Sequence, residues 1–193
     1  MGAKKGYQDN TMDILNQQLT NISAENQFLT FIIAGEEYGV DVLSVQEIIR
    51  YKKPTIIPNT PESVKGVINF RGEVVPVIDL RKKFGFKDKE YNMFTVIIII
   101  EVLNKIVGVI VDEVSDILSF SEEDIQGSLD FSSEIDTDFI SGMAKVNDRL
   151  IILIKLARLF SFSEYKALKK IDDLDNLREG EGFAKDEVVK EDD

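Results

Sequence analysis

The 193-residue sequence contains neither cysteine nor histidine. Without cysteine the chain has no disulfide framework and no thiolate metal site, which suits a reducing compartment. Without histidine it lacks the usual general base near neutral pH and the usual zinc ligand, so catalysis would have to rest on carboxylates, lysines or tyrosines. These two absences favour a binding protein over an enzyme, and we expect no cofactor and no metal site.

Phosphate-binding glycine loops and membrane-spanning segments are missing from the sequence as well. The one Gly-x-Gly motif, Gly180-Glu181-Gly182, lies in an acidic segment rather than between a strand and a helix. The apolar runs at residues 96–100 and 150–154 are too short to cross a bilayer. No apolar core follows Lys4-Lys5, so the amino terminus does not resemble a secretory signal. We therefore expect a cytoplasmic protein that does not insert directly into a membrane.

Acidic side chains dominate the charge, but they are unevenly distributed. The formal net charge is −12, and residues 172–193 hold ten acidic and three basic side chains. We expect this segment to be a disordered acidic tail. The rest of the chain is only mildly acidic and shows no basic stripe, which argues against a nucleic-acid partner. The basic cluster Arg81-Lys82-Lys83 is the exception, and we interpret it as a solvated helix face.

Short apolar stretches broken by turn signals fill most of the chain after Phe28. Alternating patterns predict strands, while three prolines between residues 54 and 61 predict an irregular connection. Near-continuous branched residues at 95–102 and 106–114 indicate strands that are buried on both faces. Many short strands of this kind favour small barrels over a layered α/β sheet.

Two internal similarities suggest that a β unit is duplicated. Residues 66–84 overlay without a gap on residues 142–160, and residues 39–48 match residues 108–117. Chance similarity between apolar strands is the alternative explanation. Duplication would give two barrels side by side, one from each copy. A seam between them, lined by branched apolar residues, would suit a helical partner.

Both ends of the chain carry helical spacing. Met12, Leu15, Leu19 and Ile22 recur every three or four residues, which fits either one short amphipathic helix or a disordered arm with scattered apolar residues. Spacing of the same kind in residues 156–170 predicts a helix near the carboxyl end.

Six motifs within residues 28–165, specific in combination, resemble those of the CheW family of chemotaxis adaptors. The motifs are Glu37-Tyr38-Gly39-Val40-Asp41-Val42, Val45-Gln46-Glu47-Ile48, Asn59-Thr60-Pro61, Lys65-Gly66-Val67-Ile68-Asn69-Phe70-Arg71-Gly72, Val75-Pro76-Val77-Ile78-Asp79-Leu80 and Val111-Asp112-Glu113-Val114-Ser115-Asp116. The resemblance implies an all-β fold of two small SH3-like five-stranded β-barrels side by side, with short helical turns, a C-terminal helix and no catalytic activity. It divides the chain into a polar arm (1–27), a CheW-like domain of two barrel subdomains (28–171) and the acidic tail (172–193).

Members of the family look like bridges between two partners. One partner is the cytoplasmic signalling tip of a chemoreceptor, and the other is the regulatory domain of the histidine kinase CheA. Such an adaptor would be recruited from the cytoplasm to receptor arrays at the membrane. By matching motif, the resemblance assigns receptor contact to Glu47, Arg71, Val96 and Val114. It assigns kinase contact to Val45 and Gly66.

Ordinary structural roles compete with these assignments. On general grounds an arginine at a hairpin tip is a solvated turn residue, and a Glu47–Arg71 pair would fix the seam rather than contact the receptor. Branched residues in strands usually face the core, so the three valines have a packing alternative. Gly66 would equally serve a backbone position with a positive φ angle.

The predicted function is that of an adaptor that couples methyl-accepting chemoreceptors to CheA without catalysis. The alternative is a CheW-like regulatory module that binds a different kinase or a nucleotide. A carboxylate enzyme would need a deep polar pocket with converging acids, for which Asp79, Asp112 and Asp116 are the candidates. Their positions at strand ends favour caps and turns instead.

Overall fold

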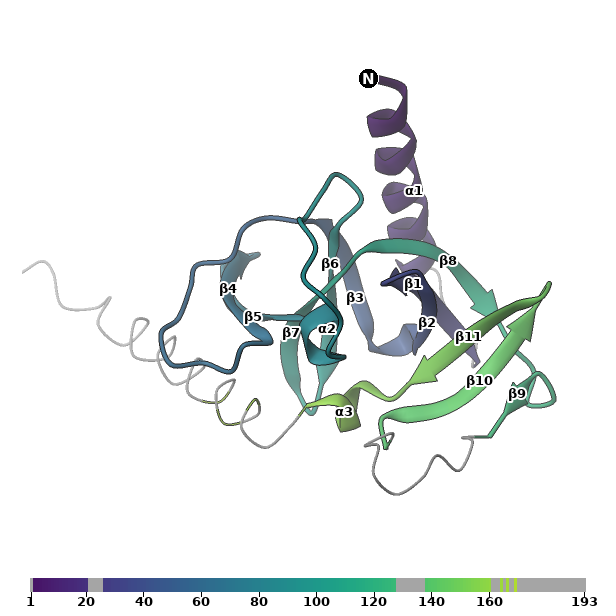
Figure 1. The fold of residues 1–193 in the computed structure, drawn as a ribbon. Coiled ribbons are helices and arrows are strands. Elements are labelled where there is room, and N and C mark those ends of the chain that lie inside the picture. The colour runs from purple at the N-terminus through teal and green to yellow at the C-terminus, as the bar shows by residue number, and fades with distance from the viewer. Residues whose placement is uncertain are drawn as a thin grey trace, which may run out of the picture.

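Strands dominate the structure and form two sheets (Figure 1). The computed structural model describes residues 2–20, 26–127 and 138–160 with Glu164, Lys166 and Lys169, and for residues 2–9 it describes the backbone alone. The first sheet contains β1 (Gln27–Ile33), β2 (Glu36–Asp41), β8 (Glu113–Ser119), β9 (Ile125–Gln126), β10 (Ile140–Val146) and β11 (Arg149–Ile154). The second contains β3 (Val45–Arg50), β4 (Val64–Phe70), β5 (Glu73–Asp79), β6 (Val96–Val102) and β7 (Lys105–Val111). The helices are α1 (Gly2–Thr20), the 3-10 turn η1 (Val42–Ser44), α2 (Leu80–Lys83) and α3 (Leu156–Leu159).

The strand order is β8-β1-β2-β11-β10-β9 in the first sheet and β3-β6-β7-β5-β4 in the second. The mainly β fold with two β units is therefore confirmed. The short strand β9 gives the first sheet one strand more than the five expected.

Each sheet takes strands from both halves of the chain, so the expectation of one barrel from each copy is wrong. The β1–β2 hairpin pairs with β8 and β11, which come late in the sequence. The β6–β7 hairpin pairs with β3 and β5, which precede it. Apolar patterning predicts where a strand lies along the chain, but it does not identify the strand's distant partner.

The two sheets have equivalent pairing, which supports the duplication. In the first sheet β2 runs parallel to β11, with Gly39 opposite Leu153. In the second sheet β7 runs parallel to β5, with Gly108 opposite Val77. The internal similarities equate Gly39 with Gly108 and Val77 with Leu153, so the same pair occurs twice. Each pair joins a strand of one copy to a strand of the other.

Each sheet is curled. The segment that follows the edge strand β3 or β8 in the sequence pairs with a strand at the opposite edge of the same sheet. After β3 the chain reaches β4, where Thr55 and Val67 exchange two backbone hydrogen bonds of 2.8 and 2.9 Å. After β8, strand β9 pairs with β10 in the equivalent way, with Gln126 opposite Met143. The two ends of each sheet are thereby connected.

Among the described residues, three clusters of buried apolar side chains form the core. One lies in the second sheet and includes Ile97 and Ile99 of β6, and a second lies in the first sheet beside β10 and β11. The largest, called here the central cluster, includes Ile98 and Ile100 of β6 together with side chains of β1, β8 and α1. Alternate residues of β6 thus enter different clusters, which confirms the prediction of a strand buried on both faces. The seam between the sheets is filled by core side chains.

A capped turn follows β5. The buried carboxylate of Asp79 accepts hydrogen bonds from the backbone N–H groups of Arg81 and Lys82, at 2.8 and 3.4 Å, and so caps α2 as predicted. Its second oxygen accepts a hydrogen bond of 2.7 Å from the Tyr91 hydroxyl. Tyr91 therefore ties the loop before β6 to the start of α2.

Replacing Tyr91 with phenylalanine is expected to lower the free energy of unfolding by about 1–2 kcal/mol near neutral pH, because the buried carboxylate loses a donor. Burial, followed by the hydrogen bond to Asp79, raises the pKa of Tyr91 from its ordinary value of 10.0. A raised folded-state pKa means that the contribution of Tyr91 is complete below about pH 10 and is lost above it. Urea unfolding at about pH 7, 10 and 11 should show a steeper alkaline loss in the wild type than in Tyr91→Phe. Equal losses would contradict this assignment.

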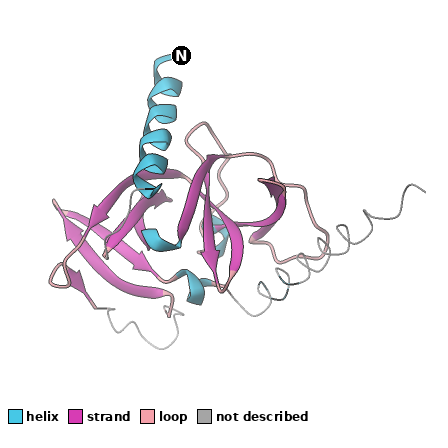
Figure 2. Ribbon diagram, turned by 180° about the vertical axis from the view of Figure 1, so that it is seen from behind, coloured by secondary structure: helices cyan, strands magenta, loops and turns pink. Residues whose placement is uncertain are grey.

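Helix α1 forms, which decides between the helix and the disordered arm expected near the amino end. Its first turns project from the body and its last turns lie against β3 (Figure 2). At the other end α3 covers the first residues of the helix predicted for residues 156–170 and ends where Phe160 adopts an extended backbone, and Glu164, Lys166 and Lys169 are again helical. Ile22 and the tail at residues 172–193 lie outside the described residues. Within the described ranges, no helix has the length and apolar character needed to cross a membrane.

Candidate functional site

Arg71 and Glu47 form an ion pair that joins the two ends of the second sheet. Arg71 lies in the β4–β5 turn with φ at 53°, and Gly72 follows with φ at 94°. Glu47 lies in β3 at the opposite edge of the sheet. The Nη2 atom of Arg71 donates to Oε2 of Glu47, and the guanidinium lies 5.1 Å from the centroid of the Phe70 ring. Two distant segments thus hold one cation in place.

This pair adds little stability but fixes a group suited to recognition. The Arg71 side chain is 74% exposed and that of Glu47 is 26% exposed, and such surface pairs contribute about 0–1 kcal/mol. The left-handed φ at Arg71 is one that glycine or asparagine usually adopts in hairpin turns, so the turn itself gives no reason for arginine. A guanidinium has several donors, and it can bind a second acceptor while it remains paired with Glu47.

Val45, Val96 and Val114 are buried, and all three belong to the central cluster. They lie on β3, β6 and β8, so the cluster brings together side chains from both sheets. The structure thus gives each valine a packing role, as branched strand residues generally have. Contact of these valines with a partner stays a prediction.

Gly66 occupies a position that other residues fit poorly. Its φ is 129°, and a Cβ atom there would lie 2.0 Å from the carbonyl oxygen of Thr55. That oxygen accepts the hydrogen bond from Val67 that connects the ends of the second sheet. Glycine is therefore needed for the fold, and kinase contact by Gly66 stays a prediction.

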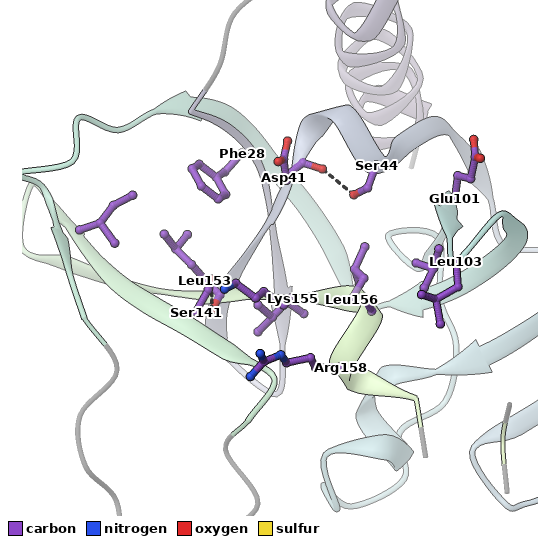
Figure 3. Close-up of a pocket in the computed structure, with 14 residues that line it drawn as sticks. Phe28, Asp41, Ser44, Glu101, Leu103, Ser141, Leu153, Lys155, Leu156 and Arg158 are labelled. Atoms are coloured by element: carbon purple, nitrogen blue, oxygen red, sulfur yellow. Dashed lines mark hydrogen bonds between the residues drawn. The ribbon is translucent and has the colours of Figure 1, made fainter. Parts of the chain in front are cut away.

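An open pocket of about 650 Å³ lies beside α3 and η1 (Figure 3). Figure 3 shows Asp41 and Ser44 on one side of it and Lys155 and Arg158 on the other. The Ser44 hydroxyl donates to the backbone oxygen of Asp41 at 2.6 Å and so holds η1 in shape. Apolar side chains complete the lining, among them Phe28, Leu153 and Leu156. An apolar floor between opposite charges suits a peptide segment rather than a small ion.

Two exposed leucines lie near this pocket, and they were not identified as site residues from the sequence. Leu43 in η1 is 67% exposed and Leu103 in the β6–β7 turn is 57% exposed. Both lie at the same end of the β3–β6 pair, where Val45 is opposite Ile100. Leu103 could have been identified from the sequence, because an apolar residue at a tight hairpin turn is uncommon. Its φ angle here is 51°. Neighbouring exposed apolar side chains indicate an interaction surface.

The basic residues of α2 are paired, so the expectation of a solvated helix face is wrong. Carboxylates from several segments converge on this turn, and all three basic side chains are mostly buried. Hydrogen bonds to Asp88 and then Glu62 raise the pKa of Lys82. The partners are Asp112 for Arg81, Asp88 and Glu62 for Lys82 at 2.6 and 2.7 Å, and Glu164 for Lys83 at 2.5 Å.

The three strand-end aspartates serve caps, turns and ion pairs, and two of them, Asp79 and Asp112, both accept hydrogen bonds from Arg81. Asp79 caps α2, and Asp112 accepts from the backbone N–H of Ala34 in addition to its pair with Arg81. Asp116 accepts from the backbone N–H of Ile117 at 2.8 Å. Among the residues that the structure describes, no acidic group of three or more could hold a metal ion.

These features define a class of protein. Two curled sheets share the central cluster, and their surface offers an arginine held by its neighbours, two exposed leucines and an apolar pocket. Such a rigid frame with separate contact surfaces is typical of a protein-binding scaffold.

Comparison with known proteins agrees with this class. The model of the CheW-like domain matches residues 27–164. The chemotaxis protein CheW of Klebsiella aerogenes is 40% identical over 147 residues, which are 76% of this chain and 89% of that protein. The probable chemotaxis protein CheW of Rhizobium etli is 38% identical over 143 residues, 74% of this chain and 92% of that protein. The crystal structure of the scaffolding protein TtCheW from Thermoanaerobacter tengcongensis matches with a TM-score of 0.67 at 39% identity, over 72% of this chain and 94% of that chain.

The chain belongs to the CheW family, and the resemblance inferred from the six motifs is confirmed. Its relatives are named as chemotaxis and scaffolding proteins.

Proposed function

We propose that this protein is a cytoplasmic adaptor that couples chemoreceptors to the histidine kinase CheA at receptor arrays, without catalysis of its own. Membership of the CheW family supports the scaffold role in chemotaxis. The single observation that carries the finer proposal is Arg71, an exposed cation held by Glu47 on one side and Phe70 on the other.

The receptor's signalling tip contacts the surface around Arg71. A fixed guanidinium presents a planar set of donors to a carboxylate or to backbone carbonyl groups. Because Glu47 and Phe70 already restrict the side chain, binding loses less rotamer freedom than it would with an unrestrained arginine. Glu47 therefore acts by positioning Arg71.

The kinase contacts the surface that bears Leu43 and Leu103, at the opposite end of β3 from Arg50. Val45, assigned to kinase contact from the motifs, begins β3 directly after η1. Gly66, also assigned to kinase contact, lies against Thr55 beyond the other end of β3, so it would act through the backbone that it stabilises. Exposed leucines supply apolar area, and the neighbouring pocket supplies charges of both signs for alignment. A bridge needs two such surfaces so that both partners bind at once.

Replacing Arg71 with glutamate is expected to weaken binding of a soluble receptor signalling fragment by about 10- to 100-fold, the range for losing a charge-assisted hydrogen bond. The fold should be retained, since the exposed ion pair contributes about 1 kcal/mol at most. Calorimetry with the receptor fragment measures the affinity. A phosphorylation assay with receptor and CheA measures the kinase stimulation. Unchanged affinity together with normal kinase stimulation would contradict the role of Arg71.

A matched control is present in the other sheet. Arg149 lies at the start of β11 beside the β10–β11 turn, is half exposed, and pairs with Glu37 at 3.3 Å. Arg149→Glu should leave receptor binding unchanged. The charge swap Glu47→Arg with Arg71→Glu restores the pair but not the cation in the β4–β5 turn, so recovery of binding by the swap would assign the pair a structural role.

A further inference from the structure

Helix α1 lies outside the part of the chain that the CheW-like model matches, yet it packs on that part. The family match begins at residue 27, whereas Met12 and Leu15 of α1 are buried in the central cluster and Leu19 packs against it. Their spacing of three and four residues places these side chains on one face of the helix. The helix thus covers a surface of the family domain with a short apolar stripe.

One polar contact sets the position of this helix. The side-chain amide of Asn16 donates to the backbone oxygen of Ile48 at 2.9 Å, and its oxygen accepts from the Ile48 N–H at 2.8 Å. Strand β3 is an edge strand of the second sheet, and edge strands present backbone groups that a partner can use. Asn16 therefore occupies a donor and an acceptor on this edge.

The surface under α1 adjoins the predicted receptor-binding residue Glu47. Ile48 is the neighbour of Glu47, whose carboxylate positions Arg71. Val96 and Val114, both assigned to receptor contact from the motifs, lie in the same central cluster as Met12 and Leu15. A partner that uses the β3 edge beside Glu47 would meet α1 first.

Helix α1 itself is suited to dissociating from the domain. Its first turn carries no acidic residue, although the amino end of a helix favours negative charge. Its described attachments include Met12, Leu15 and Leu19 and the amide of Asn16, all of which lie in the second half of the helix.

We propose that the surface under α1 binds an amphipathic helix of the receptor's signalling tip, and that α1 occupies this surface in cis until the receptor displaces it. The inference rests on the adaptor function proposed above. The surface selects a helix with apolar side chains at positions i, i+3 and i+7 and an amide at i+4, the pattern of α1 itself. Receptor affinity is then reduced by the fraction of molecules in which α1 is docked.

The test compares two substitutions in the full-length chain with a matched control on the same helix. Leu15→Asp and Asn16→Ala should release α1 and tighten binding of a soluble receptor signalling fragment by about tenfold or more, as expected if α1 is docked in nine molecules of ten. Ile14 is 49% exposed on α1, so Ile14→Asp introduces the same charge without breaking the docked face. Its receptor affinity should equal that of the wild type.

Amide exchange gives the second measurement. The Ile48 amide should exchange faster in Leu15→Asp and Asn16→Ala, while that of Ile98, deep in the core, should stay protected and so report an intact fold. A synthetic peptide of residues 8–20, added to Leu15→Asp, should restore the Ile48 protection and compete with the receptor fragment.

The outcomes separate the two proposals. A released Ile48 amide with unchanged or weaker receptor binding would overturn the competition by α1 and leave the adaptor function standing. An absence of receptor binding in the wild type and in every variant would overturn the adaptor function, and with it the partner named for this surface.

Discussion

Replacing Gly66 with alanine should lower the free energy of unfolding by about 4 kcal/mol, at the upper end of what a single substitution costs. Two effects add. The φ of 129° is strained for any residue with a Cβ atom, and this atom would lie 2.0 Å from the Thr55 carbonyl oxygen. Relief of the clash requires the Thr55–Val67 bridge to open, and this bridge connects the ends of the second sheet. Urea unfolding followed by circular dichroism measures the loss.

Gly35 provides the control for the backbone angle. It also has a positive φ, 90°, but nothing lies within 4 Å of the Cβ position. Gly35→Ala should therefore cost about 1–2 kcal/mol, from conformation alone. Equal losses in the two variants would show that the approach of Thr55 is unimportant. If Gly66→Ala kept full stability and lost only CheA binding, Gly66 would be a contact residue rather than a structural one.

Replacing Lys83 with methionine should lower the free energy of unfolding by about 3 kcal/mol, because it leaves a buried carboxylate without its cation. The side chain of Glu164 is 3% exposed, and it accepts hydrogen bonds of 2.5 Å from Lys83 and from the Ser63 hydroxyl. These contacts fasten the segment after α3 to α2 and to the residues before β4. Thermal and urea unfolding of the full-length protein provide the measurement.

The adjacent lysine is the control for this prediction. Lys82 also pairs with carboxylates, but Glu62 and Asp88 are largely exposed and can be solvated when the lysine is removed. Lys82→Met should cost clearly less stability than Lys83→Met, because its partners stay solvated. Combining Lys83→Met with Glu164→Leu should recover part of the loss, since neither charge then remains buried. A double variant less stable than Lys83→Met would contradict the burial argument.

Local chemistry in the sequence predicted local structure well. Branched runs predicted strands buried on both faces, Asp79 predicted the cap of α2, and the spacing of Met12, Leu15 and Leu19 allowed α1. The fold class followed from these elements. The allocation of strands to sheets did not follow, because the parallel pairs β2–β11 and β5–β7 depend on contacts far apart in the sequence.

The candidate site was predictable only where a motif marked it. Motif resemblance identified Glu47 and Arg71, and the structure brings them together as an ion pair. The motifs could not decide whether Val45, Val96 and Val114 are contact residues or core residues. That choice depends on the exposure of each side chain, which a strand pattern does not give. Leu43 and Leu103 were not predicted, because the exposure of a leucine depends on which side chains pack around it in the folded protein.

The exchange of strands between the two halves has a consequence for biosynthesis. The first sheet joins residues as far apart as Thr30 and Asp116, 86 positions, or Glu37 and Arg149, 112 positions. A ribosome releases β1 and β2 long before β8 and β11 exist, so the early hairpin has no permanent place to dock. Long-range pairing of this kind slows folding and leaves strand edges open to other chains in the meantime. Neither half of the polypeptide can mature alone, and a nascent chain needs protection until almost the whole domain has emerged.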